Sequence, residues 1–559
     1  MLVFDEEKQD KKLGELRKAQ EESLAHSLSR SFGVSYIDLT TAAINSDALR
    51  LVSEDEARAA NVAPFDMVGK KIKLGALAPE SEKTATIIKR LVTEGYIPTI
   101  YMVSIESLKK VWSRYTDLSF SLETKGGALD ISSEKIASFL SEVKSLEDVK
   151  NLIDTTITQK KNYKISGLLE IILAGALALG ASDIHVEPEE NFVRIRYRLD
   201  GVLSDILHFD NDIFRLLLSR IKLLSGMKLN LKGAQDGRFS IHLEDSEIEI
   251  RSSILPSAYS ESIVFRILNP KSIAVPLEQL GIPPKLLEIL LREVSKPEGM
   301  ILTTGPTGSG KTTTLYALLK KVFTPEIKVI TIENPIEYHL PGIVQTQIDA
   351  DKGYTFLEGL RSALRQDPDM IMVGEIRDQE TAEIAINSAL TGHLVFSTLH
   401  TNNAAGTFPR LIDLGVNPKI ITSALSLSMA QRLVRKLCTE CHTEVPIEGR
   451  NKEIVDRILK TIKNTSEYID SIPTVMGEGK GCEKCNFTGY RGRVGLYEAI
   501  LRTEAIEKAV KENPSERDIW KAAEGQGILN MQQDGIIKVL KKITSIPELE
   551  RVIDLENSW

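Results

Sequence analysis

The chain has 559 residues, of which 42% are hydrophobic and 26% are charged, proportions that are ordinary for folded globular protein. Lys and Arg total 70 and Asp and Glu total 78, so the net charge is −8. This balance argues against affinity of the whole chain for nucleic acid, although it leaves room for one local basic channel. The length predicts about three to five domains.

The N-terminal part is expected to be a mixed α/β domain covering 1–117. Its opening residues, MLVFDEEKQDKK, alternate in charge and lack the apolar core of a signal peptide. Periodicity predicts helices and two β-strands in this domain. The helices are expected near 12–31, 53–60, 80–94 and 104–115, and the strands near 72–77 and 99–103. Residues 118–150 are more polar and predict a linker with one helix.

An apolar run at 165–181, ISGLLEIILAGALALGA, could be mistaken for a membrane span. It is only 17 residues long and contains Glu170, whereas a spanning helix needs about 20 apolar residues. We therefore expect a buried helix around 166–180 and no direct membrane span. A soluble, cytoplasmic protein is expected.

A second α+β domain is expected over 151–272, with alternating strands at 192–198 and 248–254. Arg194, Arg196 and Arg198 alternate, so they share one face of a strand, and a solvated basic face is the favoured interpretation. Three further arginines precede the next domain and are candidates for arginine fingers, which stabilise charge in phosphoryl transfer. They are Arg238, Arg251 and Arg266.

A P-loop pattern, GPTGSGKT, occupies 305–312 directly after the apolar run 300–302. Glycines let the backbone turn tightly around phosphates, and the following helix adds the positive end of its dipole. Lys311 can reach the β- and γ-phosphates, and the Thr312 hydroxyl can ligate Mg²⁺. A glycine-rich turn that only resembles a P-loop is the weaker alternative. The predicted nucleotide-binding residues are Gly305, Pro306, Thr307, Gly308, Ser309, Gly310, Lys311, Thr312 and Thr313.

Acidic residues at two later strand ends are candidates for organising Mg²⁺ and the attacking water. The segment ENPIE contributes Glu333 and Glu337, and Glu375 ends a Walker-B-like strand. An ordinary surface carboxylate is the alternative for either segment alone. His393 and His400 bracket a third strand, and a structural role and a role near the γ-phosphate are weighed equally.

All four cysteines lie in two C-x-x-C pairs, Cys438 with Cys441 and Cys482 with Cys485. Such pairs suit tetrahedral Zn²⁺, although the gap between them is longer than usual for a zinc ribbon. Disulfides are the alternative, and a reducing cytoplasm makes them poor candidates. Redox catalysis is a further alternative, but nothing nearby in the sequence would tune a thiol.

Together these segments resemble the secretion ATPases, in particular the type II secretion and type IV pilus assembly branch. The resemblance is strong from about 165 to the end of the chain and weaker over 30–117. It rests on ITIENPIEY (330–338), LRQDPDMIMVGEIRD (364–378), TGHLVFSTLHTN (391–402), GASDIHVEP (180–188), RIRYRLDG (194–201), AQDGRFS (234–240) and the C-terminal segment 527–552. In the family the first three are the Asp box, Walker B and His box. Two positions depart from the family: Asn334 replaces the usual Asp, and Ser260 stands where Gly is frequent. The Asn leaves Glu333 and Glu337 as the carboxylates of the Asp box, with Glu333 favoured as general base and Glu337 as the alternative.

The resemblance implies an α/β multidomain protein with a RecA-like P-loop core built on a parallel sheet. We expect a P-loop domain at 273–425, a tetracysteine zinc-binding subdomain at 426–497 and a helical C-terminal subdomain at 498–559. From about 420 onward the chain is expected to be mostly helical. The cofactors implied are ATP, Mg²⁺ and Zn²⁺.

The activity implied is that of a homo-hexameric motor that hydrolyses ATP to assemble type IV pili. Its partners would be an inner-membrane platform protein and a membrane-associated cytoplasmic protein that binds the N-terminal domain. Pseudopilus assembly in type II secretion is the first alternative. A retraction motor is disfavoured because such motors generally lack the first domain and the tetracysteine insertion. A nucleic-acid translocase or helicase, and a sensor that does not hydrolyse its nucleotide, are alternatives of other classes, and no nucleic-acid partner is expected.

Overall fold

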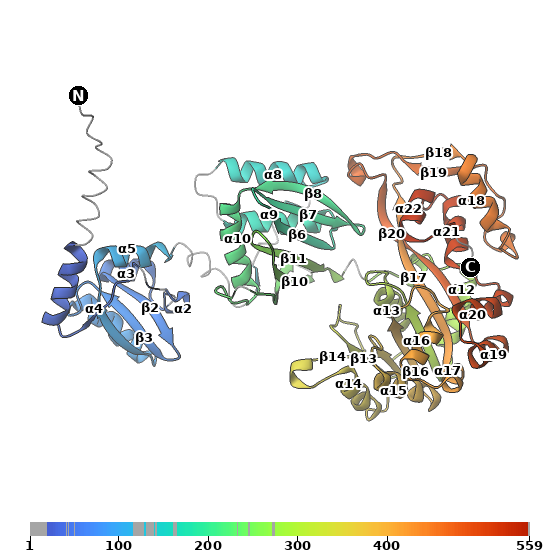
Figure 1. Ribbon diagram of the computed structural model, residues 1–559, viewed down its shortest axis with the longest axis horizontal. Helices are drawn as coiled ribbons and strands as arrows, with labels where there is room; N and C mark the ends of the chain where they lie inside the picture. Colours follow the sequence, from blue (N-terminus) through green and yellow to red (C-terminus); the bar gives the residue numbers. More distant parts are fainter. Residues whose placement is uncertain are drawn as a thin grey trace. The chain divides into compact units, whose positions relative to one another are not determined.

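The computed structural model describes residues 20–40, 42, 44–49, 51–115, 128–129, 139, 142–159, 165–231, 233–243, 246–270 and 274–556 (Figure 1). These residues form two compact units. One contains the described residues of 1–130, 164–167 and 210–232, and the other contains the rest. The start of the predicted first helix, 12–19, and most of the predicted linker, 118–150, lie outside the described residues.

The N-terminal domain is a four-stranded sheet of order β1-β4-β3-β2 with helices packed against it. Its strands are β1 (Ser35–Tyr36), β2 (Val62–Val68), β3 (Lys71–Ala76) and β4 (Ile97–Met102). Its helices are 20–31, α2 (Ser46–Leu49), α3 (Glu54–Ala60), α4 (Glu82–Thr93) and α5 (Ile105–Ser113), and the same unit includes α10 (Asn211–Leu224). Serine side chains cap α3, α4 and α5 by accepting backbone N–H bonds, which fixes where these helices begin. The helices predicted near 53–60, 80–94 and 104–115 and both strands are confirmed.

A second sheet of seven strands has the order β5-β9-β10-β11-β6-β7-β8. Its strands are β5 (Ala128–Leu129), β6 (Asp183–Pro188), β7 (Val193–Leu199), β8 (Val202–Phe209), β9 (Gln235–Leu243), β10 (Ser246–Pro256) and β11 (Glu261–Leu268). α8 (Leu146–Gln159) and α9 (Ile165–Ala178) precede β6, and the Tyr197 hydroxyl on β7 donates to the Ile172 carbonyl of α9. α9 is largely buried, as predicted for the apolar run. Across the described part of the chain, no helix has both the length and the apolar character needed to cross a membrane.

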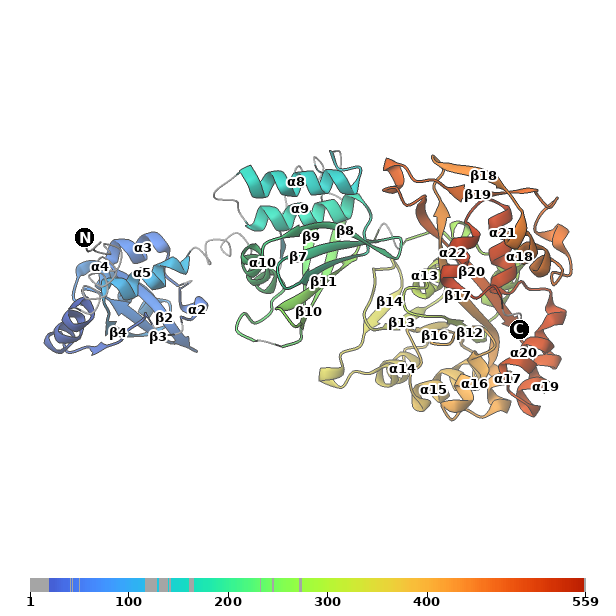
Figure 2. The same ribbon diagram turned by 45° about the horizontal axis from the view of Figure 1, so that its top comes forward.

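The third sheet has seven strands in the order β14-β13-β15-β16-β12-β17-β20, and only the β17–β20 pair is antiparallel. Its parallel strands are β12 (Gly299–Thr304), β13 (Val329–Glu333), β14 (Val344–Gln347), β15 (Met370–Val373) and β16 (Leu394–Leu399). Alternate residues of β12 enter two different cores, Met300 and Leu302 in one and Ile301 in the other. Both faces of this sheet are therefore buried, as parallel sheets require (Figure 2).

Helices supply the other side of each core. They are α12 (Pro284–Val294), α13 (Lys311–Val322), α14 (Phe356–Leu364), α15 (Gln379–Leu390), α16 (Thr407–Asp413) and α17 (Pro418–Ala424). Side chains of α12 and α13 pack on one face, and side chains of α14, α15 and α16 pack on the other.

The prediction that the chain is mostly helical from about 420 is wrong for 425–501. β17 (Leu425–Leu437) and β20 (Tyr490–Leu501) are long strands that extend the third sheet, and β18 (His442–Pro446) pairs with β19 (Val475–Gly479). The pattern of β17, LSLSMAQRLVRKL, is compatible with either a helix or a strand, and pairing with β12 and β20 decides between them. Helices do form α18 (Gly449–Leu459) and, after the sheet, α19 (Glu504–Glu512), α20 (Glu516–Ala523), α21 (Met531–Leu540) and α22 (Ile546–Val552).

Candidate functional site

The loop at 305–310 joins the carboxyl end of β12 to the start of α13, as the P-loop pattern predicts. Lys311 is the first residue of α13, and its Nζ donates to the carbonyls of Gly305 (2.9 Å) and Pro306 (3.1 Å). Burial lowers the pKa of Lys311, and the nearby carboxylate of Glu375 opposes that shift. The ammonium is thus held inside the loop, on the side where phosphates would lie.

Two glycines in this loop are required by Gln431 of β17. Gly305 (φ +145°) would place a Cβ 2.4 Å from the Gln431 carbonyl oxygen, and Gly310 (φ +87°) would place one 2.8 Å from Nε2 of the same residue. Gln431 is 1% exposed and accepts a hydrogen bond from the Thr314 hydroxyl at 2.8 Å. Gln431 therefore packs directly against the backbone of the loop. The sequence analysis did not select it, because its only signal is a polar residue within a largely apolar strand.

The Ser309 hydroxyl is buried and has no hydrogen-bond partner among the described residues. An anion held in the loop would provide one, so the loop fits the phosphates of a nucleotide. A hollow of about 260 Å³ opens beside 306–309, and Arg432, Arg493 and Arg551 line it. Sequence reasoning did not select these arginines, because they are separated along the chain and lie together only in the fold.

The Glu375 carboxylate lies just beyond β15 and is held on both oxygens. Arg377 donates to Oε1, and His400 Nε2 lies 3.3 Å from Oε2. Parallel pairing of β15 with β16 and of β16 with β12 places Glu375 and His400 at the carboxyl edge of the sheet, where the P-loop also begins. The fold therefore brings together three segments of the predicted site.

His393 lies at the opposite end of the same strand. Its carbonyl accepts from Gly299 N at the start of β12, and its ring Nδ1 lies 3.1 Å from the Ser388 carbonyl. Because a strand rises about 3.3 Å per residue, roughly 20 Å separates His393 from His400. The two histidines were weighed equally from the sequence, and only His400 lies next to an acidic residue of the site.

Glu333 and Glu337 have different surroundings. Glu333 is 2% exposed and accepts hydrogen bonds from the Thr331 and Tyr316 hydroxyls and from Gln345 Nε2. Glu337 is partly exposed, and burial raises its pKa while Arg251 and Arg266 oppose the rise. Burial raises the pKa of Glu333 as well. Glu337 is thus the carboxylate of the pair that solvent can reach. Asn334, where the family usually has Asp, is exposed.

The three candidate fingers lie in one row across the second sheet. Arg251 of β10 is directly opposite Arg238 of β9 on one side and Arg266 of β11 on the other. Residues directly opposite one another share a sheet face, so the row presents three guanidinium groups together. Arg251 Nη2 also donates to the Ile336 carbonyl at 3.3 Å, next to Glu337.

The other arginine trio is paired rather than freely solvated. Arg194 contacts Glu189 at 2.8 Å, Arg196 contacts Glu187 at 2.7 Å, and Arg198 contacts Asp183 at 3.3 Å. These contacts make the face of β7 a network of ion pairs, which replaces the predicted solvated basic face.

The four cysteines converge although the two pairs are far apart in sequence. All four Sγ atoms lie within 4.8 Å of one another, with Cys438–Cys482 at 3.9 Å and Cys441–Cys485 at 3.7 Å. A tetrahedral Zn²⁺ with Zn–S bonds of about 2.3 Å would separate its sulfurs by about 3.8 Å. All four thiols are free, which excludes the disulfide alternative in this structure. The donor set therefore fits zinc.

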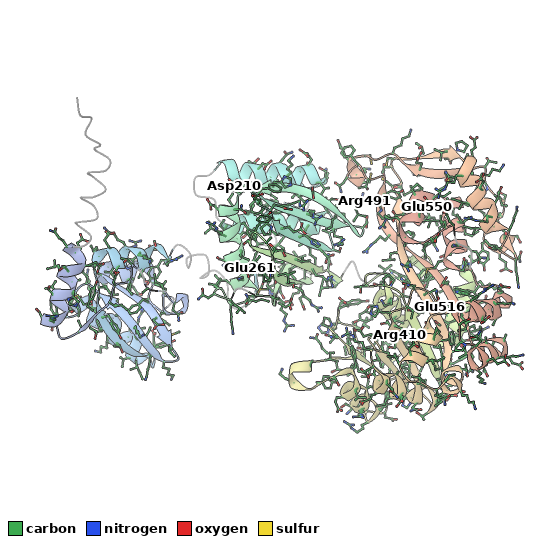
Figure 3. The ribbon with its side chains drawn as sticks, in the orientation of Figure 1. Asp210, Glu261, Arg410, Arg491, Glu516 and Glu550 are labelled. Atoms are coloured by element: carbon green, nitrogen blue, oxygen red, sulfur yellow. The ribbon has the colours of Figure 1, made fainter. Side chains whose placement is uncertain are left out.

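A cavity of about 680 Å³ in the second unit, with no lining residue from the 305–313 loop, is lined in part by Tyr468, Trp520 and Met531. At its edge Glu498 of β20 is 5% exposed, and its oxygens accept from Ala404 N (2.9 Å) and Met531 N (3.1 Å). Ala404 follows Asn403, whose side chain donates to Glu516 of α20 at 2.7 Å. Figure 3 labels Glu516 among the side chains of the C-terminal region. Burial raises the pKa of Glu498 from 4.5 to about 7.

Titration of this buried carboxyl is expected to make the stability of the fold depend on pH. Since its folded pKa is raised, its stabilising contribution is complete below pH 4.5 and is lost as pH rises through about 7. The shift corresponds to about 3 kcal/mol. Glu498→Gln should remove this dependence, so the Tm of the variant relative to wild type should rise steadily between pH 5 and pH 8. The exposed Glu504→Gln is the control, and parallel Tm curves for Glu498→Gln and wild type would contradict the assignment.

The fold is that of a mixed α/β protein with acidic residues at the carboxyl edge of its third sheet, and known proteins show a related family. The family model described as "Type II/IV secretion system protein" matches residues 158–551. Type II secretion system protein E of Klebsiella pneumoniae is 39% identical over 436 residues, covering 78% of this chain and 84% of that protein. The type IV pilus assembly ATPase PilB of Myxococcus xanthus is 34% identical over 533 residues, covering 95% of this chain and 91% of that protein.

Among solved structures, the ATPase DotB of Yersinia pseudotuberculosis matches with a TM-score of 0.51 and 20% identity, over 70% of this chain and 95% of that one. At this identity the match supports the fold alone. The chain belongs to the type II/IV secretion system protein family, the secretion and pilus ATPases, as the resemblance in the sequence predicts. Type II secretion names predominate among the relatives, so a role in pilus assembly in particular is not favoured.

Proposed function

We propose that this chain is a Mg²⁺-dependent motor ATPase that drives the assembly of a pilin-like filament. One observation carries the proposal. The Lys311 loop, Glu375 with His400, and the Glu333–Glu337 segment all follow the carboxyl ends of parallel strands of one sheet. Open parallel sheets bind ligands at this edge. Mg²⁺, when bound, would neutralise charge on the β- and γ-phosphate oxygens.

Each group in the site then has a role. Residues 305–313 hold the phosphates, Lys311 pairs with the β- and γ-phosphates, and the Thr312 hydroxyl holds Mg²⁺ together with Glu375. Glu337, rather than Glu333, accepts the proton of the attacking water, because both Glu333 oxygens are already occupied by buried donors. His400 orients Glu375.

The arginine row Arg238–Arg251–Arg266 supplies positive charge for the transition state. Arginine suits this role, because its guanidinium group stays protonated and matches the geometry of phosphate oxygens. The contact of Arg251 with the carbonyl beside Glu337 favours Arg251 as the member of the row closest to the reacting groups.

We further propose that the motor works as a cytoplasmic homo-hexamer at the inner membrane, with a zinc-stapled subdomain at 426–497. Residues 1–117 would bind a membrane-associated partner, 118–150 would be the linker, and 151–272 would move against the P-loop domain at 273–425. The C-terminal subdomain at 498–559 would complete each protomer. The filament would be a secretion pseudopilus or a type IV pilus. Most of the relatives are named for type II secretion, which favours the pseudopilus.

Lys311→Ala is expected to weaken ATP binding about 10- to 100-fold, since a hydrogen-bonded charge contact contributes about 1.5–3 kcal/mol. Glu375→Gln should retain nucleotide binding and lose phosphate release. Nucleotide binding is measured by fluorescence with a labelled ATP, and turnover by phosphate release with Mg²⁺, using the exposed Glu326→Gln as control. Full phosphate release by either variant would refute the site. Strong stimulation by DNA, with no response to the cytoplasmic part of a platform protein, would refute the motor assignment.

A further inference from the structure

The geometry points to Gln345 of β14 as a positioning residue for the loop that carries Glu337. The inference rests on the proposed function, because it concerns the same general base. Gln345 is partly buried and pairs with Thr331 of β13, two residues before Glu333, in the register of β13 and β14. Its side-chain amide contacts four groups that belong to three different segments of the domain.

The first two contacts hold the 334–340 loop itself. Gln345 Oε1 accepts from Leu340 N at 2.6 Å, and Gln345 Nε2 donates to the Tyr338 carbonyl at 3.0 Å. A backbone N–H can only donate and a carbonyl can only accept, so the orientation of the amide is determined. Glu337 directly precedes Tyr338, so the amide fixes the backbone immediately after the proposed base.

The other two contacts join this loop to the buried end of β13 and to the P-loop helix. Gln345 Nε2 lies 3.2 Å from Glu333 Oε1 and 3.3 Å from the Tyr316 hydroxyl of α13, and that hydroxyl in turn donates to Glu333. Tyr316 is fully buried, and its ring packs edge-on against Tyr338 with centroids 4.8 Å apart. The pKa of Tyr316 is raised by burial and by Glu333, while a hydrogen bond from the Glu337 backbone opposes the rise.

The cluster of Tyr316, Glu333, Gln345 and Tyr338 therefore gives Glu333 a definite role. Its buried carboxylate accepts hydrogen bonds from the Tyr316 hydroxyl and from Gln345 Nε2. Gln345 in turn hydrogen-bonds to the backbone of the loop that carries Glu337. Because Tyr316 sits on the helix that begins with Lys311, the position of Glu337 is tied to the segment that holds the phosphates. Displacement of a catalytic group by about 1 Å can cost about 100-fold in rate.

The test is Gln345→Met, which keeps the length of the side chain and removes every hydrogen bond. We expect kcat to fall about 10- to 100-fold while the KM for ATP stays within about twofold, because the contacts of Lys311 are untouched. Gln345→Glu should be worse than Gln345→Met, since it places a second carboxylate against Glu333. A role in packing alone would give the reverse order. The exposed Gln366→Met serves as the matched control.

Two further measurements keep the result decisive. Hydrogen exchange at Leu340 N should accelerate in Gln345→Met, and the effects of Gln345→Met and Glu337→Gln on kcat should be less than additive. If Gln345→Met fails to fold, Tyr316→Phe removes one hydroxyl of the cluster and should lower kcat without raising KM. Wild-type kcat in the folded variants, together with an inactive Glu337→Gln, would overturn the role of Gln345 alone. An active Glu337→Gln would instead overturn the general base on which it rests.

Discussion

Glu337→Gln is expected to lower kcat for ATP hydrolysis by about 10²- to 10⁴-fold, the range that general base catalysis contributes. An amide of the same shape cannot accept the proton of the attacking water. The surroundings of Glu337 suit a general base. Burial raises its pKa, and the positive charges of Arg251 and Arg266 oppose that rise. Phosphate release under single-turnover conditions measures the effect, and binding of labelled ATP should stay close to wild type.

The pH profile supplies an independent check on the same residue. A base works in its ionised form, so kcat of the wild type should rise with pH through the pKa of Glu337, which lies above the ordinary 4.5. The residual activity of Glu337→Gln should lack that limb, whereas Glu326→Gln, at an exposed position, should keep it. A Glu337→Gln profile that superimposes on wild type at full rate would show that another group accepts the proton.

If the four sulfurs hold zinc as proposed, its removal is expected to loosen the two cysteine knuckles between β17 and β20. The four sulfurs tie the end of β17, at Cys438, to the turn before β20, at Cys485. Backbone N–H groups of Cys482 and Gly489 also point at the Cys485 sulfur, at 3.1 and 3.3 Å. Structural zinc binds small domains with apparent free energies of about 10–16 kcal/mol, so its loss should remove a strong constraint on the knuckles. Side chains of α18 and β19 keep their packing in a core that also contains Val434 and Val494.

We expect one zinc per chain by elemental analysis, with four thiols released when a mercurial displaces it. Cys482→Ser should lose the metal, become sensitive to protease within 438–489 and show a lower Tm. Glu483→Gln changes an exposed residue of the same knuckle and should retain the metal. Added Zn²⁺ should restore protease resistance to chelated wild type. Four freely reactive thiols in metal-free, fully folded wild type would contradict the zinc site.

Several features could be predicted from the sequence because they depend on neighbours along the chain. The P-loop is a contiguous pattern of strand, glycines, Lys-Thr and helix, and each part acts on the next few residues. The apolar run of α9 could likewise be interpreted from local sequence, since its length and Glu170 favour a buried helix over a membrane-spanning one. The two C-x-x-C pairs also predicted a group of four thiolates that could bind a metal, because the spacing within each pair is local.

Other features depend on which distant segments pair, and no local pattern encodes that. Gln431 lies far from the P-loop in sequence and supports it only because β17 pairs with β12. The strands β17 and β20 looked helical or ambiguous, and the sheet that they join decides their conformation. The row Arg238–Arg251–Arg266 arises from the register of two hairpin-like pairings, in which a shift of one residue would turn each arginine to the other face.

The pair Glu333 and Glu337 shows the same division within five residues. Both were evident as carboxylates at a strand end, and the family resemblance made both candidates for the base. Local sequence says which groups can ionise, because ionisation is a property of the side chain. Which of them is free to act depends on burial and on donors from α13 and β14, and those are set by long-range packing. The kinds of chemical group that this protein can use are therefore evident from its sequence. Which particular carboxylate is free to act is decided by the tertiary structure, because donors that occupy Glu333 come from distant segments.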